Sequence, residues 1–193
     1  MTSLVSAQQT TEQALTAARH LAAAGEAHQY LTFLLSGEMY AVGILNVKEI
    51  IEYGSLTEIP MMPAFIRGVI NLRGSVVPVV DLAARFGQVQ SEVGKRTCIV
   101  IVEARQGGER HDLGIIVDAV SEVLEIPGSE IEPPPSFGAK IRADFISGMG
   151  KVGGKFVILL DIQRVLSVDE MAVLSEVGRS NGDWIENSAT HVH

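Results

Sequence analysis

The stretch FIRGVINLRGSVVPVVDLAARFG, residues 65–87, decides the fold. Its apolar first half leads into Arg73-Gly74, where the tolerance of glycine for positive φ makes a chain reversal inexpensive. The β-branched run over residues 76–80 has the composition of a return strand. Asp81 then stands where it can cap a short helix, and Gly87 suits the left-handed exit of that helix. The stretch therefore predicts a strand, a tight turn, a second strand and a short helix.

The same stretch resembles the signature of the CheW family of chemotaxis coupling proteins, which is close to PxFIxGVxNLRGxxxPVxDL. Here the match runs from Pro63 through Asn71-Leu72-Arg73-Gly74 to Asp81-Leu82. A weaker likeness extends from about Gln29 to Leu166, which is most of the chain without either tail. The resemblance implies a mainly β fold of two small SH3-like five-stranded barrels, partly interleaved, with a few short helices.

The order of elements divides the chain into three parts. We expect a helical or flexible extension over 1–28, a CheW-like domain over 29–168, and a C-terminal helix with a disordered tail over 169–193. The extension is rich in alanine and buries little area, which favours a mobile segment over a docked helix. Within the domain we expect two β lobes, roughly 40–95 and 96–160, with an exchange of the first and last strands left open.

An internal repeat supports the two lobes. The motif Phe65-Ile66-x-Gly68 returns as Phe145-Ile146-x-Gly148, displaced by 80 positions. Each copy is too small to bury its own faces well, so we expect the two to pack as a pair. Asn71-Leu72-Arg73 corresponds to Lys151-Val152-Gly153, so the turn itself does not require the arginine. The further matches are Gly74 with Gly154, Asp81-Leu82 with Asp161-Ile162, Gly43 with Gly114, and Val47 with Val120.

Composition argues against several classes of function. The formal charge is −8 over 193 residues, and phosphate neutralisation needs clustered Lys and Arg, so we expect no nucleic-acid partner. Cys98 is the only cysteine, which excludes an intramolecular disulfide and a cysteine-based metal site. No apolar run is long enough for a bilayer and the N-terminus lacks signal-peptide features, so we expect a cytoplasmic protein without direct membrane insertion.

Motifs of catalysis and cofactor binding fail on their context. Gly148-x-Gly150-x-x-Gly153 has the letters of a dinucleotide fingerprint, but a strand pattern follows it where a helix has to begin. In the body of the chain the histidines lack a companion at metal-ligand spacing, and no serine in a nucleophile context accompanies His111-Asp112. We therefore expect no enzyme, catalytic residue, cofactor or metal, and keep a small nucleotide-binding protein or enzyme as a minor alternative.

A carboxylate and a guanidinium are the first candidates for partner binding. Glu49 and Arg73 suit a bidentate contact, which contributes only about 0–1 kcal/mol to stability when exposed. Orientation of a partner explains such a pair better than fold stability, with an ordinary solvated ion pair as the alternative. By resemblance the pair lies on the receptor-binding surface, beside an apolar groove between the lobes. The groove residues that the resemblance implies, each equally compatible with the core, are Ile44, Val47, Val120 and Val123.

Two further positions are candidates for kinase binding. By resemblance Gly68 lies near the kinase-facing surface. Phe137 stands on the loop PPPSFG, where proline lowers the ordering cost of presenting a ring, and a ring folded back over the lobe is the alternative. The resemblance implies a scaffold that joins the cytoplasmic tips of methyl-accepting chemoreceptors to the regulatory domain of the histidine kinase CheA at membrane-bound receptor arrays. An adaptor in a surface-sensing or pilus pathway is the alternative.

Overall fold

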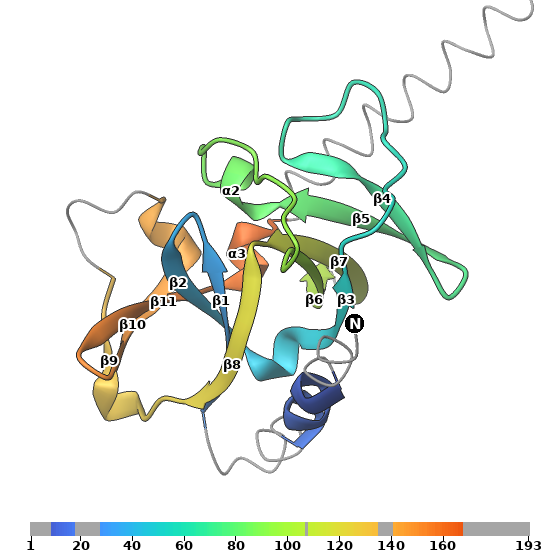
Figure 1. The fold of residues 1–193 in the computed structure, drawn as a ribbon. Helices are drawn as coiled ribbons and strands as arrows, with labels where there is room; N and C mark the ends of the chain where they lie inside the picture. The colour runs from blue at the N-terminus through green and yellow to red at the C-terminus, as the bar shows by residue number, and fades with distance from the viewer. Residues whose placement is uncertain (1–8, 18–27, 107, 135–140, 168–193) are drawn as a thin grey trace, which may run out of the picture.

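Two β sheets make up most of the structure, a computed structural model that describes residues 9–17, 28–106, 108–134 and 141–167 (Figure 1). One sheet has six strands in the order β8-β1-β2-β11-β10-β9, and the other has five in the order β3-β6-β7-β5-β4. The mainly β fold class is therefore confirmed. The strands are β1 Gln29–Leu35, β2 Glu38–Gly43, β3 Val47–Glu52, β4 Ile66–Leu72, β5 Ser75–Asp81, β6 Cys98–Gln106, β7 Glu109–Val117, β8 Ala119–Glu125, β9 Ile131–Glu132, β10 Ile146–Val152 and β11 Lys155–Leu160.

The helices are short. Asp81 accepts a hydrogen bond from the amide of Ala84, and Asp161 accepts from the amides of Gln163 and Arg164, so both predicted helix caps are confirmed. Residues 9–17 are helical, while residues 1–8, 18–27 and 168–193 lie outside the described residues. The other helical segments are η1 Ile44–Asn46, α2 Leu82–Arg85, η2 Gly128–Glu130, η3 Ala143–Phe145 and α3 Ile162–Val165.

The pairing of the strands repeats between the two sheets. β5 runs parallel to β7 and antiparallel to β4, and β11 runs parallel to β2 and antiparallel to β10. The register shift within residues 66–68 returns within residues 146–148. In the same registers Val79 pairs with Gly114 and Leu159 pairs with Ala41, so the predicted match of Gly43 with Gly114 is wrong. Each sheet is one copy of the same unit, and the larger sheet adds β9.

The boundary between the lobes differs from the prediction. We expected a division between residues 95 and 96, but β6 and β7 pair with β3 and β5, so the first lobe spans β3 to β7. β1 and β2 cross to the second lobe and pair there with β8 and β11. The prediction was wrong because alternation identifies a hairpin without identifying the sheet edge to which that hairpin is added.

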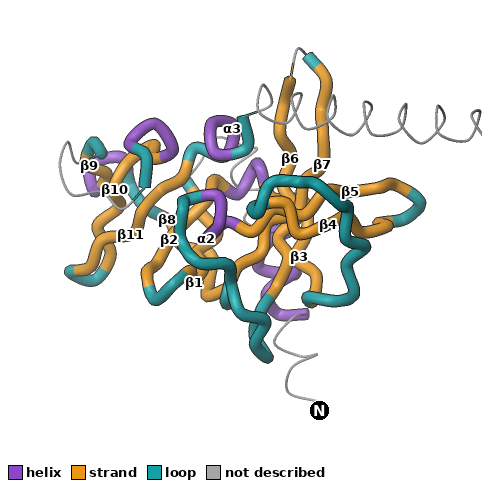
Figure 2. Tube along the Cα trace, turned by 90° about the horizontal axis from the view of Figure 1, so that it is seen from above, coloured by secondary structure: helices purple, strands orange, loops and turns teal. Residues whose placement is uncertain are grey.

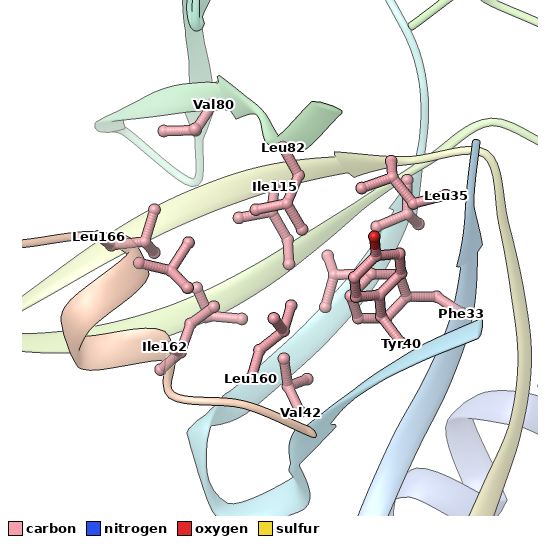
Figure 3. Close-up of a cluster of buried hydrophobic side chains, with 14 of the residues drawn as sticks. Phe33, Leu35, Tyr40, Val42, Val80, Leu82, Ile115, Leu160, Ile162 and Leu166 are labelled. Carbon is pink, nitrogen blue, oxygen red and sulfur yellow. The ribbon is translucent and has the colours of Figure 1, made fainter. Parts of the chain in front are cut away.

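A shared core joins the lobes. Alternation along each strand sends one face inward, where Val77 and Ile99 fill the first lobe, and sends the other face toward the second lobe. Figure 3 shows Val80 and Ile115 from the first lobe and Leu160 from the second as members of one buried cluster. Burying one such side chain contributes about 1.5–3 kcal/mol, so separating the lobes costs far more than the domain has to spare. The expected packing of two lobes as a pair is therefore present.

Two polar side chains connect the lobes at the edge of this core. The guanidinium of Arg85 lies 5.2 Å from the ring centre of Phe65 and 4.8 Å from that of Phe145, and its Nε donates to the carbonyl of Val165 at 2.9 Å. The side chain of Gln163 accepts from the amide of Arg105 and donates to a carbonyl of β6. Cation–π contacts contribute up to about 2 kcal/mol when desolvated, so these contacts hold the lobes in one orientation.

Candidate functional site

The turn between β4 and β5 carries an arginine in an unusual backbone conformation. Arg73 has φ 51° and Gly74 has φ 86°, both in the left-handed region that a two-residue hairpin turn requires. The corresponding turn of the second lobe uses Gly153 and Gly154, with φ 56° and 78°. A residue with a Cβ costs roughly 1–2 kcal/mol in this region. The first lobe therefore places an arginine where glycine would be easier, which indicates that the side chain has a use.

That side chain forms a bidentate ion pair with Glu49 of β3. Both contacts, Nη1 to Oε1 and Nη2 to Oε2, measure 2.9 Å. The predicted contact between the two residues is therefore present. The arginine side chain is 77% exposed and the glutamate side chain 19%, so Glu49 serves as a fixed acceptor that holds an exposed guanidinium. Because β3 and β4 are the two edges of the five-stranded sheet, the pair also links its open sides.

Further charges surround the pair. Lys48 forms ion pairs with Asp112 at 2.6 Å and with Glu103 at 3.4 Å. The hydrogen bond that Lys48 donates to Asp112, together with weaker effects of Glu103, raises the pKa of Lys48 above its ordinary value. A cleft of about 580 Å³ lies alongside, lined by Glu49 and Arg73 from the first lobe and by residues of helix 9–17. The surface is therefore polar and mixed in charge, which suits an oriented contact with a charged partner.

The four predicted groove residues are less accessible than a groove requires. Ile44 is 1% and Val47 0% exposed, and both lie in the shared core. Val120 and Val123 are partly buried against that core. In this conformation a partner reaches at most the last two. The exposed apolar residue of this region is Leu45 of η1, which is 61% exposed and which the sequence reasoning missed.

Leu15 of helix 9–17 was also missed. It is 3% exposed and belongs to the shared core cluster, so this part of the extension is docked. The prediction of a mobile segment was therefore wrong for residues 9–17. The sequence did carry a signal, since Leu15 is the only large apolar residue between positions 9 and 17. A lone leucine in such a setting indicates an anchor for the helix.

Of the two kinase-binding candidates, the structure describes only Gly68. Gly68 has φ 152° and is buried, and a Cβ there would lie 2.5 Å from the carbonyl oxygen of Thr57. The amide and carbonyl of Thr57 pair with those of Val69 at 3.0 and 2.9 Å. Gly68 therefore permits a close backbone approach and offers no side chain to a partner. Phe137 lies outside the described residues.

The described residues can also be compared with the requirements of a metal site, a reactive cysteine and a membrane-spanning helix. No group of three or more His, Cys, Asp or Glu side chains within the described ranges is arranged to hold a metal ion. Burial raises the pKa of the Cys98 thiol, which lowers its reactivity. Among the helices that the structure describes, none has the length and apolar character needed to cross a bilayer.

Comparisons with known proteins agree with the architecture. Residues 29–170 match the family model of the CheW-like domain. Chemotaxis protein CheW of Klebsiella aerogenes is 37% identical over 153 residues, which cover 79% of this chain and 90% of that protein. Chemotaxis protein CheW of Rhizobium meliloti is 31% identical over 154 residues, covering 80% and 96%. The crystal structure of the scaffolding protein TtCheW from Thermoanaerobacter tengcongensis matches with a TM-score of 0.66 at 38% identity, covering 74% of this chain and 89% of that one.

Two β lobes around a shared core, with the matches above, define a non-catalytic scaffold of chemotaxis signalling. The chain belongs to the CheW family of chemotaxis proteins. The resemblance first seen in residues 63–82 is therefore confirmed, and so is the expectation of a scaffold in place of an enzyme, because the members of this family are scaffolding proteins.

Proposed function

We propose that this scaffold couples the cytoplasmic tips of methyl-accepting chemoreceptors to the histidine kinase CheA, at receptor arrays on the cytoplasmic face of the membrane. The observation that carries the proposal is the exposed Arg73, held by Glu49 in a turn that would form more easily with glycine. A guanidinium that donates to one carboxylate and is otherwise exposed to solvent can bind a second carboxylate on a partner. The receptor tip is the partner assigned to this surface.

The kinase contact belongs to another face of the first lobe. Gly68 supports the segment around Thr57, and the loop between β3 and β4 that contains this segment exposes Met61 and Ile59. The regulatory domain of CheA is the partner assigned there, with Phe137 as a second contact. A substitution at Gly68 would then act on the kinase indirectly, through displacement of the neighbouring loop.

The mechanism requires no bond to be made or broken. Two moderate contacts on one body raise the effective concentration of kinase at receptor. Because the lobes share one core, a rearrangement of the receptor moves the whole scaffold, and contact free energies at the kinase change with it. The arrangement therefore suits transmission as well as tethering.

Co-sedimentation with receptor-containing membranes and CheA tests this proposal. Replacement of Arg73 by Asp should remove the scaffold from the receptor pellet while leaving its binding to isolated CheA unchanged. Lys155→Asp is the matched control, because it makes the same kind of charge change on the exposed hairpin of the second lobe. Retention of the Arg73→Asp variant in the pellet would refute the assignment of the receptor surface.

A further inference from the structure

Helix 9–17 lies against the surface assigned to the receptor. Both views place it beside η1 and the beginning of β3 (Figures 1 and 2). Its one large apolar side chain, Leu15, is buried in the cluster that also contains Ile44 and Val47. These are two of the residues that the family resemblance assigns to the groove. The helix therefore lies at the edge of the region that the family resemblance assigns to the groove.

The same helix also borders the polar part of the surface. Glu12, Leu15 and Thr16 line the cleft that Glu49 and Arg73 line from the first lobe. The helix thus brings an aliphatic side chain to the buried cluster and, three residues earlier, a carboxylate to the cleft that the Arg73 guanidinium also lines. This pattern fits a helix-in-groove partner that carries an acidic residue one turn before its anchor.

The docked helix is easy to displace. Its described part is only nine residues long, whereas isolated helices below about 12–15 residues are marginal in water. Leu15 is its only buried side chain, since Thr11 is half-buried and the other seven described positions are exposed. The free energy gained by burying one leucine is reduced by the cost of ordering the segment, so the net preference for the docked state is at most on the order of tenfold. A partner helix can overcome a preference of that size.

We propose that helix 9–17 is an intramolecular occupant of the receptor groove, and that a receptor helix with the same acidic and aliphatic pattern has to displace it. The identity of that partner rests on the proposed function, whereas the docking of the helix does not. The self-occupied groove lowers the apparent affinity for the receptor by the fraction of molecules that are open. The extension thereby sets a threshold for recruitment.

Substitution of Leu15 tests the inference in the full chain. Leu15→Asp should raise amide hydrogen exchange over residues 44–52 by about tenfold and should tighten binding of a soluble receptor tip fragment by a similar factor. Leu15→Ala should shift both quantities in the same direction by less. Ala14→Asp is the matched control, because it adds the same charge on the exposed face of the same helix and should change neither.

Each outcome decides a separate point. Unchanged exchange in Leu15→Asp would show that the helix is not docked and would overturn the inference, while Arg73→Asp continues to test the receptor surface. Raised exchange with unchanged affinity would overturn the competition. A fall in receptor affinity together with a large fall in the unfolding midpoint would identify Leu15 as an ordinary core residue and would also overturn it. If no variant binds receptor, the proposed function fails and the exchange data still decide whether the helix docks.

Discussion

Replacing Arg73 by glycine should move stability and receptor binding in opposite directions. Relief of the left-handed φ of 51° gains roughly 1–2 kcal/mol, and loss of the exposed pair with Glu49 costs about 0–1 kcal/mol. The free energy of unfolding should therefore stay unchanged or rise by up to about 2 kcal/mol, which corresponds to a gain of several degrees in the midpoint for a chain of this size. A purely structural arginine would give the opposite sign.

Receptor affinity should fall in the same variant. A hydrogen bond to a charged group contributes about 1.5–3 kcal/mol, so loss of the guanidinium should weaken binding of a receptor tip fragment roughly 10- to 100-fold. Urea denaturation and isothermal titration calorimetry measure the two quantities on one sample. Gly153→Arg is the matched control, because it places the same side chain at φ 56° in the corresponding turn, with open space around the Cβ position. It should lose about 1–2 kcal/mol of stability and keep its receptor affinity. A destabilised Arg73→Gly variant, or one that binds receptor normally, would refute the reasoning.

Three further predictions concern the frame of the site. Gly68→Ala should lose about 2–4 kcal/mol, because the new Cβ meets the carbonyl oxygen of Thr57, and hydrogen exchange should increase around that segment; normal stability would show that the loop yields freely. Asp81→Ala should lower the free energy of unfolding, measured by urea denaturation, by about 3 kcal/mol, since Asp81 is fully buried and pairs with Arg67. Asp161 is a partly exposed helix cap, so Asp161→Ala should lower it by only about 1 kcal/mol. Equal losses would contradict the difference in burial. Burial, followed by the charge of Glu38, raises the pKa of Tyr40 to about 12. As pH rises, the tyrosine therefore ionises first in the unfolded state, and the free energy of unfolding should fall by about 2 kcal/mol between pH 10 and 12. Tyr40→Phe should flatten that part of the pH profile.

Local chemistry allowed the central unit to be predicted. The turn at Arg73-Gly74, the cap at Asp81 and its counterpart at Asp161 depend on residues close in sequence, and all are present. The contact of Glu49 with Arg73 was also anticipated, although it joins the edges of a sheet. That contact came from the family resemblance, because spacing along the chain does not say which strand lies beside a turn.

The missed features depend on long-range packing. Ile44 and Val47 satisfy a groove pattern and a core pattern equally well, and only the tertiary packing around them decides that they are buried. The burial of Leu15 was not predicted, because an alanine-rich segment by itself has little apolar area to bury. The partner of β6 and β7 was missed for a similar reason, since every strand in the chain alternates in much the same way.

The crossing of β1 and β2 into the far lobe has a consequence for biosynthesis. The first lobe is continuous along the chain from β3 to β7, so its strands can pair once β7 has left the ribosome, but the face that it turns to the second lobe stays uncovered until that lobe follows. β2 ends at Gly43, but its parallel neighbour β11 begins only at Lys155. At about 5–20 residues per second, the early hairpin waits about 6–20 s with an apolar edge unsatisfied. The hairpin of β1 and β2 therefore leaves the ribosome before every strand that pairs with it and is completed last, and during that interval its unpaired edge is open to aggregation.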